Sequence, residues 1–218
     1  MIHQIFINIG KGELKDLPQF NWTRKKTEHY AEKKEIPYKL WGKKEIEDLM
    51  DENGWREFYD NLRYDIQRID FARLVILYVF GGLYLDLDVN PFPDVDIKWI
   101  FLEDFFIARW NKSHLPYNAI LGCKQGDPLM YKCIQEVMRS YEEKKDKEIY
   151  LIRKARFVFQ TTGHYALHRV LKKEVKYAPV VSVLNTIKNI SDCCPKGQAY
   201  FMDYSASVWY NDEFKQGA

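Results

Sequence analysis

The chain has few cysteines, and their spacing excludes two common ways of stabilising a protein. The four cysteines among 218 residues include no C-x-x-C pair and none of the spacings of a zinc site. Cys193 and Cys194 are adjacent, which is poor geometry for a disulfide between them. We therefore expect reduced thiols, which are typical of proteins in a cytosolic setting.

The chain also lacks a long apolar run. No stretch approaches the ~20 apolar residues that span a bilayer. The N-terminus has no basic segment followed by an apolar one, as a signal peptide would have. These absences predict a cytoplasmic protein without membrane insertion.

Neither an excess of one charge nor low-complexity sequence is present. The balance of 33 basic and 31 acidic residues, a net charge of +2, argues against nucleic-acid binding driven by bulk charge. No Pro/Gly/Ser-rich linker or internal repeat divides the chain. Hydrophobic residues make up 46% of the sequence, which is enough for a sizeable core. The sequence therefore predicts one domain over residues 1–218.

What the sequence does have is one organising stretch, residues 68–90. Residues 66–80 are apolar at helical spacing and at most other positions, which predicts a helix that is covered on most sides. Gly81 is suited to end that helix in a left-handed conformation, and Gly82 to reverse the chain. Leu83–Val89 then alternates between aliphatic and polar residues, which predicts a strand.

Three polar side chains share one face of that predicted strand, namely Tyr84, Asp86 and Asp88. Two carboxylates this close repel each other, and partial burial raises the cost of keeping both ionised. A divalent cation such as Mg²⁺ or Mn²⁺ removes that cost and keeps positions open for water and phosphate oxygens. The alternative is a solvated strand end whose aspartates face water. Asp70 and Arg73 in the apolar helix favour the first interpretation, because a buried ion pair contributes little stability by itself.

The polar residues and glycines of this stretch resemble the sugar-nucleotide signature of DXD glycosyltransferases: Asp70-x-x-Arg73, then Gly81-Gly82-x-Tyr84-x-Asp86-x-Asp88. The family includes yeast-type initiating mannosyltransferases, capsular-sugar transferases and, more distantly, the glucosylating domains of large clostridial toxins. Three further segments are similar to the family pattern: Ile2–Phe6, Tyr38–Trp41 and Ser207–Trp209. The short chain also resembles a stand-alone transferase encoded by a large algal virus.

This resemblance implies a GT-A-like α/β fold, in which a mixed, mostly parallel central sheet of Rossmann type is flanked by helices. The nucleotide-sugar half would cover about residues 1–90 and the acceptor half about residues 91–218. We expect Ile2–Ile9 to be the first strand, and ligands bind beyond the carboxyl ends of parallel strands. Phe6 and the backbone of Ile7 are therefore placed to meet a nucleobase. The alternative for Phe6 is core packing.

The resemblance also implies roles for the residues of the central stretch. Asp88 would bind the metal ion directly, and Asp86 would bind it through water or hold the ribose as well. Asp70 and Arg73 would hydrogen-bond the sugar hydroxyls, a task that suits a bidentate guanidinium. Tyr84 would pack beside the ribose or the base.

Residues far from the central stretch complete the expected site. Asn118 would touch the donor sugar, and its alternative role is to cap a turn. Thr162 and Gly163 lie in a segment similar to the family's T-G-P turn, and either of them would lie near the bound sugar. Ser207 and Trp209 would close over the diphosphate, although Trp209 could instead be a buried aromatic. The family pattern has no clean match for the third metal ligand, and we expect Asp203 in that place.

The predicted reaction moves a hexose from a nucleoside-diphosphate sugar to a hydroxyl of a glycan or glycoprotein acceptor. A UDP-sugar such as UDP-glucose is the favoured donor, and Mn²⁺ or Mg²⁺ would act as a Lewis acid on the diphosphate. The resemblance implies retention at the anomeric carbon, but no residue stands out as a nucleophile. Two alternatives remain open. One is a metal-dependent phosphohydrolase or nuclease, which needs further acidic or histidine ligands, and the other is a non-catalytic module that binds sugar nucleotides or glycans.

Overall fold

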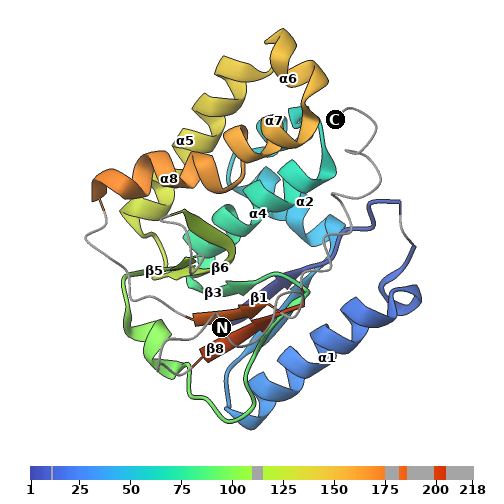
Figure 1. The fold of residues 1–218 in the computed structure, drawn as a ribbon, viewed down its shortest axis with the longest axis vertical. Helices are drawn as coiled ribbons and strands as arrows, with labels where there is room; N and C mark the ends of the chain where they lie inside the picture. The colour runs from blue at the N-terminus through green and yellow to red at the C-terminus, as the bar shows by residue number, and fades with distance from the viewer. Residues whose placement is uncertain (11, 110–114, 175–181, 186–198, 205–218) are drawn as a thin grey trace.

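The computed structural model describes residues 1–10, 12–109, 115–174, 182–185 and 199–204, and these form an α/β protein (Figure 1). The strands are β1 (Ile2–Ile5), β2 (Tyr38–Trp41), β3 (Gly82–Leu85), β4 (Val89–Pro91), β5 (Phe105–Arg109), β6 (Pro116–Cys123), β7 (Ser182–Asn185) and β8 (Ala199–Asp203). The α-helices are α1 (Pro18–Lys33), α2 (Lys43–Glu52), α3 (Arg56–Asn61), α4 (Asp65–Phe80), α5 (Pro128–Lys144), α6 (Glu148–Ile152), α7 (Lys154–Thr161) and α8 (His164–Glu174). Two short 3₁₀ helices are η1 (Leu14–Asp16) and η2 (Lys98–Leu102).

The strands form a central sheet of five strands in the order β2-β1-β3-β6-β5 and a second sheet of three in the order β4-β8-β7. In the central sheet β1 is parallel to β2 and β3, whereas β6 is antiparallel to β3 and β5. Parallel neighbours need long crossovers, and α1 connects β1 to β2 while α2, α3 and α4 connect β2 to β3. The predicted mixed α/β sheet is confirmed, and its parallel pairing is confined to β1 and its two neighbours.

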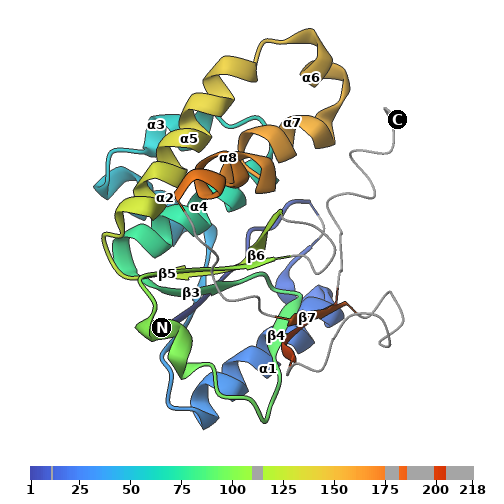
Figure 2. The same ribbon diagram turned by 60° about the vertical axis from the view of Figure 1, so that its left-hand side comes forward.

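The central sheet is covered on both faces (Figures 1 and 2). The helices α2, α4, α5, α7 and α8 lie on one side, and α1 lies with the second sheet on the other. The helix α4 packs against α5, α7 and the sheet, and its residues 70–77 are all buried. The predicted buried helix is therefore confirmed, although Phe80 at its end is 48% exposed. None of the helices in the described ranges is long and apolar enough to cross a bilayer.

Two glycines connect α4 to β3 as the sequence predicts. Gly81 has a φ of 66°, and its N–H donates to the carbonyl of Leu77 at 2.8 Å. Gly82 has a φ of 100°, and a Cβ there would lie 2.5 Å from the carbonyl oxygen of Met1. Only glycine permits both this conformation and this approach of two backbones.

The predicted strand Leu83–Val89 is wrong beyond Leu85. The chain leaves the central sheet at Asp86, whose N–H makes a last hydrogen bond to the carbonyl of Ala119 at 2.9 Å. A turn follows, closed by the N–H of Val89 on the carbonyl of Asp86 at 3.0 Å, and β4 then pairs with β8 in the second sheet. Gln4 Nε2 also donates to that carbonyl at 3.1 Å. The two aspartates therefore lie on a turn between the sheets and not on one face of a strand.

The predicted first strand Ile2–Ile9 is also shorter than expected. Its last pair in the ladder is Ile5 with Trp41, and Trp41 is the final residue of β2. Phe6 donates its N–H to the carbonyl of Trp41 at 2.9 Å, after which no described strand pairs with the segment. Residues 6–9 consequently form an irregular exit from β1, which opens a pocket.

Candidate functional site

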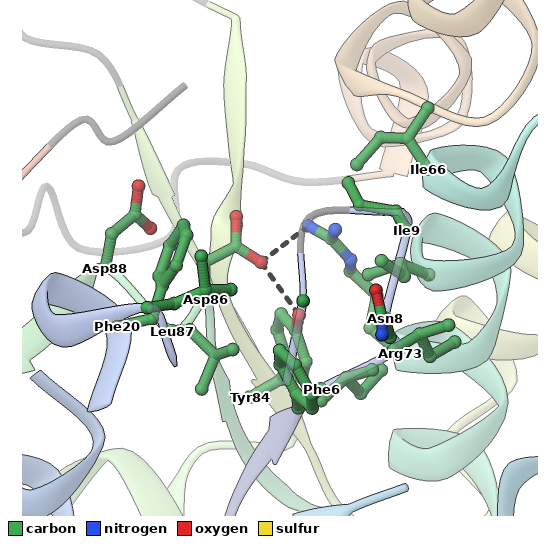
Figure 3. A pocket seen from close by; sticks show the side chains of 15 residues that line it. Phe6, Asn8, Ile9, Phe20, Ile66, Arg73, Tyr84, Asp86, Leu87 and Asp88 are labelled. Carbon is green, nitrogen blue, oxygen red and sulfur yellow. Dashed lines mark hydrogen bonds and ion pairs between the residues drawn. The ribbon is translucent and has the colours of Figure 1, made fainter. Parts of the chain in front are cut away.

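The pocket lies at the carboxyl ends of β1 and β3 (Figure 3). Its walls come from residues 5–9 after β1, from Tyr84 and residues 86–88 after β3, and from α4. Apolar side chains line the rest: Leu17 before α1, Phe20 of α1, and Ile66 and Ile69 of α4. One end of the pocket is therefore apolar, and the other carries the charged residues of the central stretch.

Arg73 organises the charged end. Its side chain is almost fully buried, with Nη2 lying 2.9 Å from Asp70 Oδ1 and Nη1 lying 3.3 Å from Asp86 Oδ1. Nη1 also donates to the carbonyl of Asn118 at 2.8 Å, and the guanidinium lies 4.9 Å from the centre of the Tyr84 ring. Burial alone would lower the pKa of Arg73, but the surrounding carboxylates, Asp86 foremost, raise it above its ordinary value. Its buried Nε has no hydrogen-bond partner among the described residues.

Asp70 is held from three sides. Besides the ion pair with Arg73, it accepts hydrogen bonds from Thr162 Oγ1 at 2.8 Å and from Asn118 Nδ2 at 3.2 Å. Burial raises the pKa of Asp70 to about 6, although Arg73 and Thr162 favour the carboxylate. The carboxylate is 4% exposed, and its contacts keep it from turning toward the pocket as a free nucleophile. Its geometry suits it to orient Arg73 and Asn118.

Asp86 and Asp88 are the exposed carboxylates of the site. Both are partly exposed, and in Figure 3 both carboxylates point to the same side of the pocket. Tyr84 donates its hydroxyl to Asp86 Oδ1 at 2.7 Å, so Arg73 and Tyr84 fix the same oxygen. Burial raises the pKa of Tyr84 well above its ordinary value, which keeps the hydroxyl protonated as a donor. Both carboxylates line the pocket.

These two carboxylates fit a divalent cation, because they offer hard oxygen donors that are partly open to solvent. Two protein carboxylates with substrate phosphates are a common set for Mg²⁺. Asp203, the expected third ligand, lies opposite Val89 in the register of β4 and β8 and is 2% exposed. It accepts a hydrogen bond from the hydroxyl of Tyr117. Across the residues that the structure describes, no group of three or more His, Cys, Asp or Glu side chains could hold a metal ion. Asp203 as a ligand stays a prediction.

The structure brings most of the predicted site residues together. Phe6 and Ile7 line the pocket with Arg73, Tyr84, Asp86 and Asp88, while Asp70 and Asn118 lie directly behind Arg73. Ser207 and Trp209 lie outside the described residues. Thr162 donates its hydroxyl to the carboxylate of Asp70, and its place near a bound sugar stays a prediction.

Sequence reasoning missed the apolar wall of Leu17, Phe20, Ile66 and Ile69. Phe20 lies just before a charged segment, residues 22–34, that is typical of a surface helix, and α4 is apolar on nearly every side. Periodicity therefore does not reveal which apolar residues face a cavity. Reasoning from the sequence also missed that Tyr117 contacts Asp203, because these residues come from two different sheets.

Comparison with known proteins gives a family match over part of the chain and a similar fold. Residues 16–106 match the family model described as the glycosyltransferase sugar-binding region containing DXD motif. Inositol phosphoceramide mannosyltransferase 3 of Schizosaccharomyces pombe is 32% identical over 81 residues, which are 37% of this chain and 22% of that protein. An uncharacterized glycosyltransferase of Acanthamoeba polyphaga mimivirus is 32% identical over 134 residues, which are 59% of this chain and 51% of that protein. The chain thus spans between about a fifth and a half of these relatives.

Among solved structures, the PaToxG glycosyltransferase aligns with a TM-score of 0.53 and 14% sequence identity. The match covers 80% of this chain and 68% of that one. At this identity the likeness concerns the fold alone, and it confirms the predicted GT-A-like architecture.

Proposed function

We propose that this chain, whose residues 16–106 match the sugar-binding region of DXD glycosyltransferases, transfers a hexose from a nucleoside-diphosphate sugar to a hydroxyl acceptor. The observation that carries the proposal is a single pocket lined by Arg73, Asp86 and Asp88 at one end and by apolar side chains at the other. A nucleoside-diphosphate sugar is divided in the same way, with a flat base at one end and a charged diphosphate and a polar sugar at the other.

The apolar end would hold the nucleobase and ribose. Phe6, Phe20 and Ile69 offer an apolar slot, and aromatic side chains favour flat ligands. The backbone of residues 6–9 has no strand neighbour and could donate or accept hydrogen bonds with the edge of the base. Tyr84 forms the floor of the pocket next to the carboxylate of Asp86.

The charged end would hold the diphosphate and the hexose. The buried Nε–H of Arg73 has no hydrogen-bond partner among the described residues, so it could donate to a sugar hydroxyl. Asp70, Asn118 and Tyr84 hold the guanidinium in place, so a donor sugar would meet groups that need little reorganisation. Asp86 and Asp88 would hold the divalent cation, with Asp203 proposed as a third ligand. The cation supplies Lewis acidity that stabilises the departing diphosphate.

Four finer points are part of the proposal. A UDP-sugar is the first donor to test, given the resemblance to glucosylating toxins, and a mannose donor is the second, given the names of the fission yeast relatives. Retention at the anomeric carbon is expected. The acceptor is a hydroxyl of a glycan, a glycoprotein or, as in the name of the same relatives, an inositol phosphoceramide. Ser207 and Trp209 are proposed to cover the diphosphate.

Turnover of sugar nucleotides tests the proposal. Purified protein is incubated with UDP-glucose or GDP-mannose, with and without Mn²⁺, and release of the nucleoside diphosphate is measured with and without acceptor glycosides. We expect metal-dependent release from one donor, and a loss of at least about 100-fold in Asp88→Asn, since a metal ion contributes several kcal/mol to such steps. The matched control is Asp104→Asn, because Asp104 is an exposed carboxylate away from the pocket.

Release that needs no metal ion, or that Asp88→Asn leaves intact, would contradict the proposed site. Metal-dependent binding without release from either donor would favour the non-catalytic binding module instead.

A further inference from the structure

The described surface has one cluster of exposed aliphatic side chains, at one end of the long axis of the molecule (Figure 1). Residues 147–156, here called the α6 tip, comprise the short helix α6 and its flanks. Within it Ile149, Leu151 and Ile152 are 44%, 52% and 60% exposed. Tyr150, between them, packs its ring 5.9 Å from that of Phe157. One aromatic side chain therefore fixes α6 to the body of the protein, while three aliphatic side chains face water.

Basic side chains surround these three residues. Lys147, Arg153, Lys154 and Arg156 are all exposed, and none of them forms an ion pair with another described residue. The only acid of the α6 tip is Glu148, so the tip has a net charge of +3 from four basic residues and one acidic residue. The whole chain has only +2, so the remainder is slightly acidic. The positive charge is therefore concentrated where the aliphatic side chains are exposed.

We propose that the α6 tip docks on an anionic membrane surface, with the aliphatic side chains entering the headgroup region and the basic ones contacting lipid phosphates. Apolar residues within a basic surface are the pattern of interfacial membrane binding, in which burial and charge attraction act together. Docking of this kind lies on the bilayer without crossing it.

Other occupants fit the same surface less well. A second copy of this chain would bring one tip of charge +3 against another in a symmetric contact, and like charges repel. Three aliphatic side chains also expose far less than the about 800 Å² that each partner of a stable protein interface buries. A nucleic acid would contact the basic side chains but leave the central aliphatic ones without a partner, since phosphates and sugars dominate such contacts.

The tip is connected to the candidate site by one helix. α7 begins at Lys154 and ends at Thr161, and its eight residues span about 12 Å. Gln67 Nε2 donates to Thr161 Oγ1 at 2.8 Å, and the adjacent Thr162 contacts Asp70. Docking by the α6 tip would therefore hold the Asp70 and Arg73 end of the pocket close to the lipid headgroups. The inference does not depend on the proposed transfer reaction, because the charge and exposure of the tip carry it.

Vesicle sedimentation tests the proposal with the whole chain. Vesicles of phosphatidylcholine alone and vesicles with about one third phosphatidylserine are compared at low and high salt. We expect binding only to the anionic vesicles, and we expect salt to weaken it. Ile149→Ser/Leu151→Ser/Ile152→Ser should abolish most of the binding, and Arg153→Gln/Lys154→Gln should weaken it about 25-fold, or about fivefold for each basic residue near the surface.

Matched controls come from other parts of the surface. Leu102→Ser removes an aliphatic side chain that is 77% exposed, and Lys25→Gln/Lys33→Gln removes two exposed lysines of α1. Both controls should bind the anionic vesicles like the wild type. Donor binding measured by calorimetry should be equal in all variants. A loss of vesicle binding can then be assigned to the α6 tip and not to the proposed donor site.

Three results would overturn the inference: no binding to anionic vesicles, equal binding to neutral ones, or equal loss in the controls. A fourth such result would come from light scattering. If the wild type is a dimer and the triple serine variant is a monomer, the surface binds a second copy of the chain.

Discussion

The buried ion pair of Arg73 and Asp70 leads to a prediction that distinguishes effects on stability from effects on donor binding. Arg73→Met keeps much of the side-chain length and removes the charge. The variant leaves Asp70, which is 4% exposed, with Thr162 and Asn118 as its remaining partners. Its effect should therefore come mainly from the carboxylate that it leaves behind.

The expected magnitude follows from that burial. Removing one partner of a buried ion pair costs about 3–5 kcal/mol, because the remaining charge is uncompensated. The pKa of Asp70 is raised by burial and lowered by Arg73, so loss of Arg73 should raise it further. Asp70→Asn, which has no charge to leave behind, should restore at least about 2 kcal/mol when it is added to Arg73→Met.

Urea unfolding of the wild type, both single variants and the double variant measures this coupling. Arg56→Met with Asp60→Asn is the matched control, since this pair at 2.8 Å is largely exposed and should change stability by no more than the error of the fit. Donor binding should be weak in all three variants of the buried pair, whatever their stability. Additive losses of stability at Arg73 and Asp70 would refute the assignment of a buried, coupled pair.

Three further predictions concern stability and the geometry of the site. Burial lowers the pKa of His3 to about 4. This residue should therefore lower the free energy of unfolding by about 3 kcal/mol as pH falls from 6.5 to 4. Unfolding experiments on His3→Gln should show a smaller loss of stability over that range. Gly82→Ala places a Cβ 2.5 Å from the carbonyl of Met1 at a φ of 100°, so it should lower the free energy of unfolding by more than about 2 kcal/mol. Thr162→Val removes a hydrogen bond to the buried carboxylate of Asp70 and should weaken donor binding by about tenfold in calorimetry.

Each of these has its own control. His29→Gln replaces an exposed histidine as the control for His3→Gln. If both variants change the pH dependence of stability equally, burial of His3 does not explain it. Gly10→Ala also has a positive φ but no atom within 4 Å of the added Cβ, so it should cost clearly less than Gly82→Ala. Thr162→Ser keeps the hydroxyl and should restore binding, and equal weakening in both variants at this position would show that the hydroxyl is not the cause.

The parts of the fold that local chemistry decides were predictable from the sequence. An all-round apolar segment must be covered, which made α4 recognisable, and the pair Gly81 and Gly82 marked its end. The strand β5 (Phe105–Arg109) is likewise formed by a short run of mostly apolar residues, which is a local signal. The carboxylates of Asp86 and Asp88 were predictable as a pair because they are close in sequence.

The parts that depend on distant partners were not predictable. The end of β3 at Leu85 follows from the pairing of β4 with β8, which comes more than a hundred residues later in the chain. The contact between Thr162 and Asp70 joins residues 92 positions apart. Phe20 lines the pocket only because α1 crosses beside the end of β3, and nothing in its own segment distinguishes it from a surface aromatic.

Calorimetric titration of UDP-glucose, GDP-mannose and UDP, each with and without Mn²⁺, tests the central claim most directly. The account predicts that at least one of these nucleotides binds in a metal-dependent way and that Asp88→Asn abolishes this binding while the protein stays folded. Absence of binding under every condition, or binding that neither the metal ion nor the loss of Asp88 changes, would contradict the assignment of this pocket to a nucleoside-diphosphate sugar.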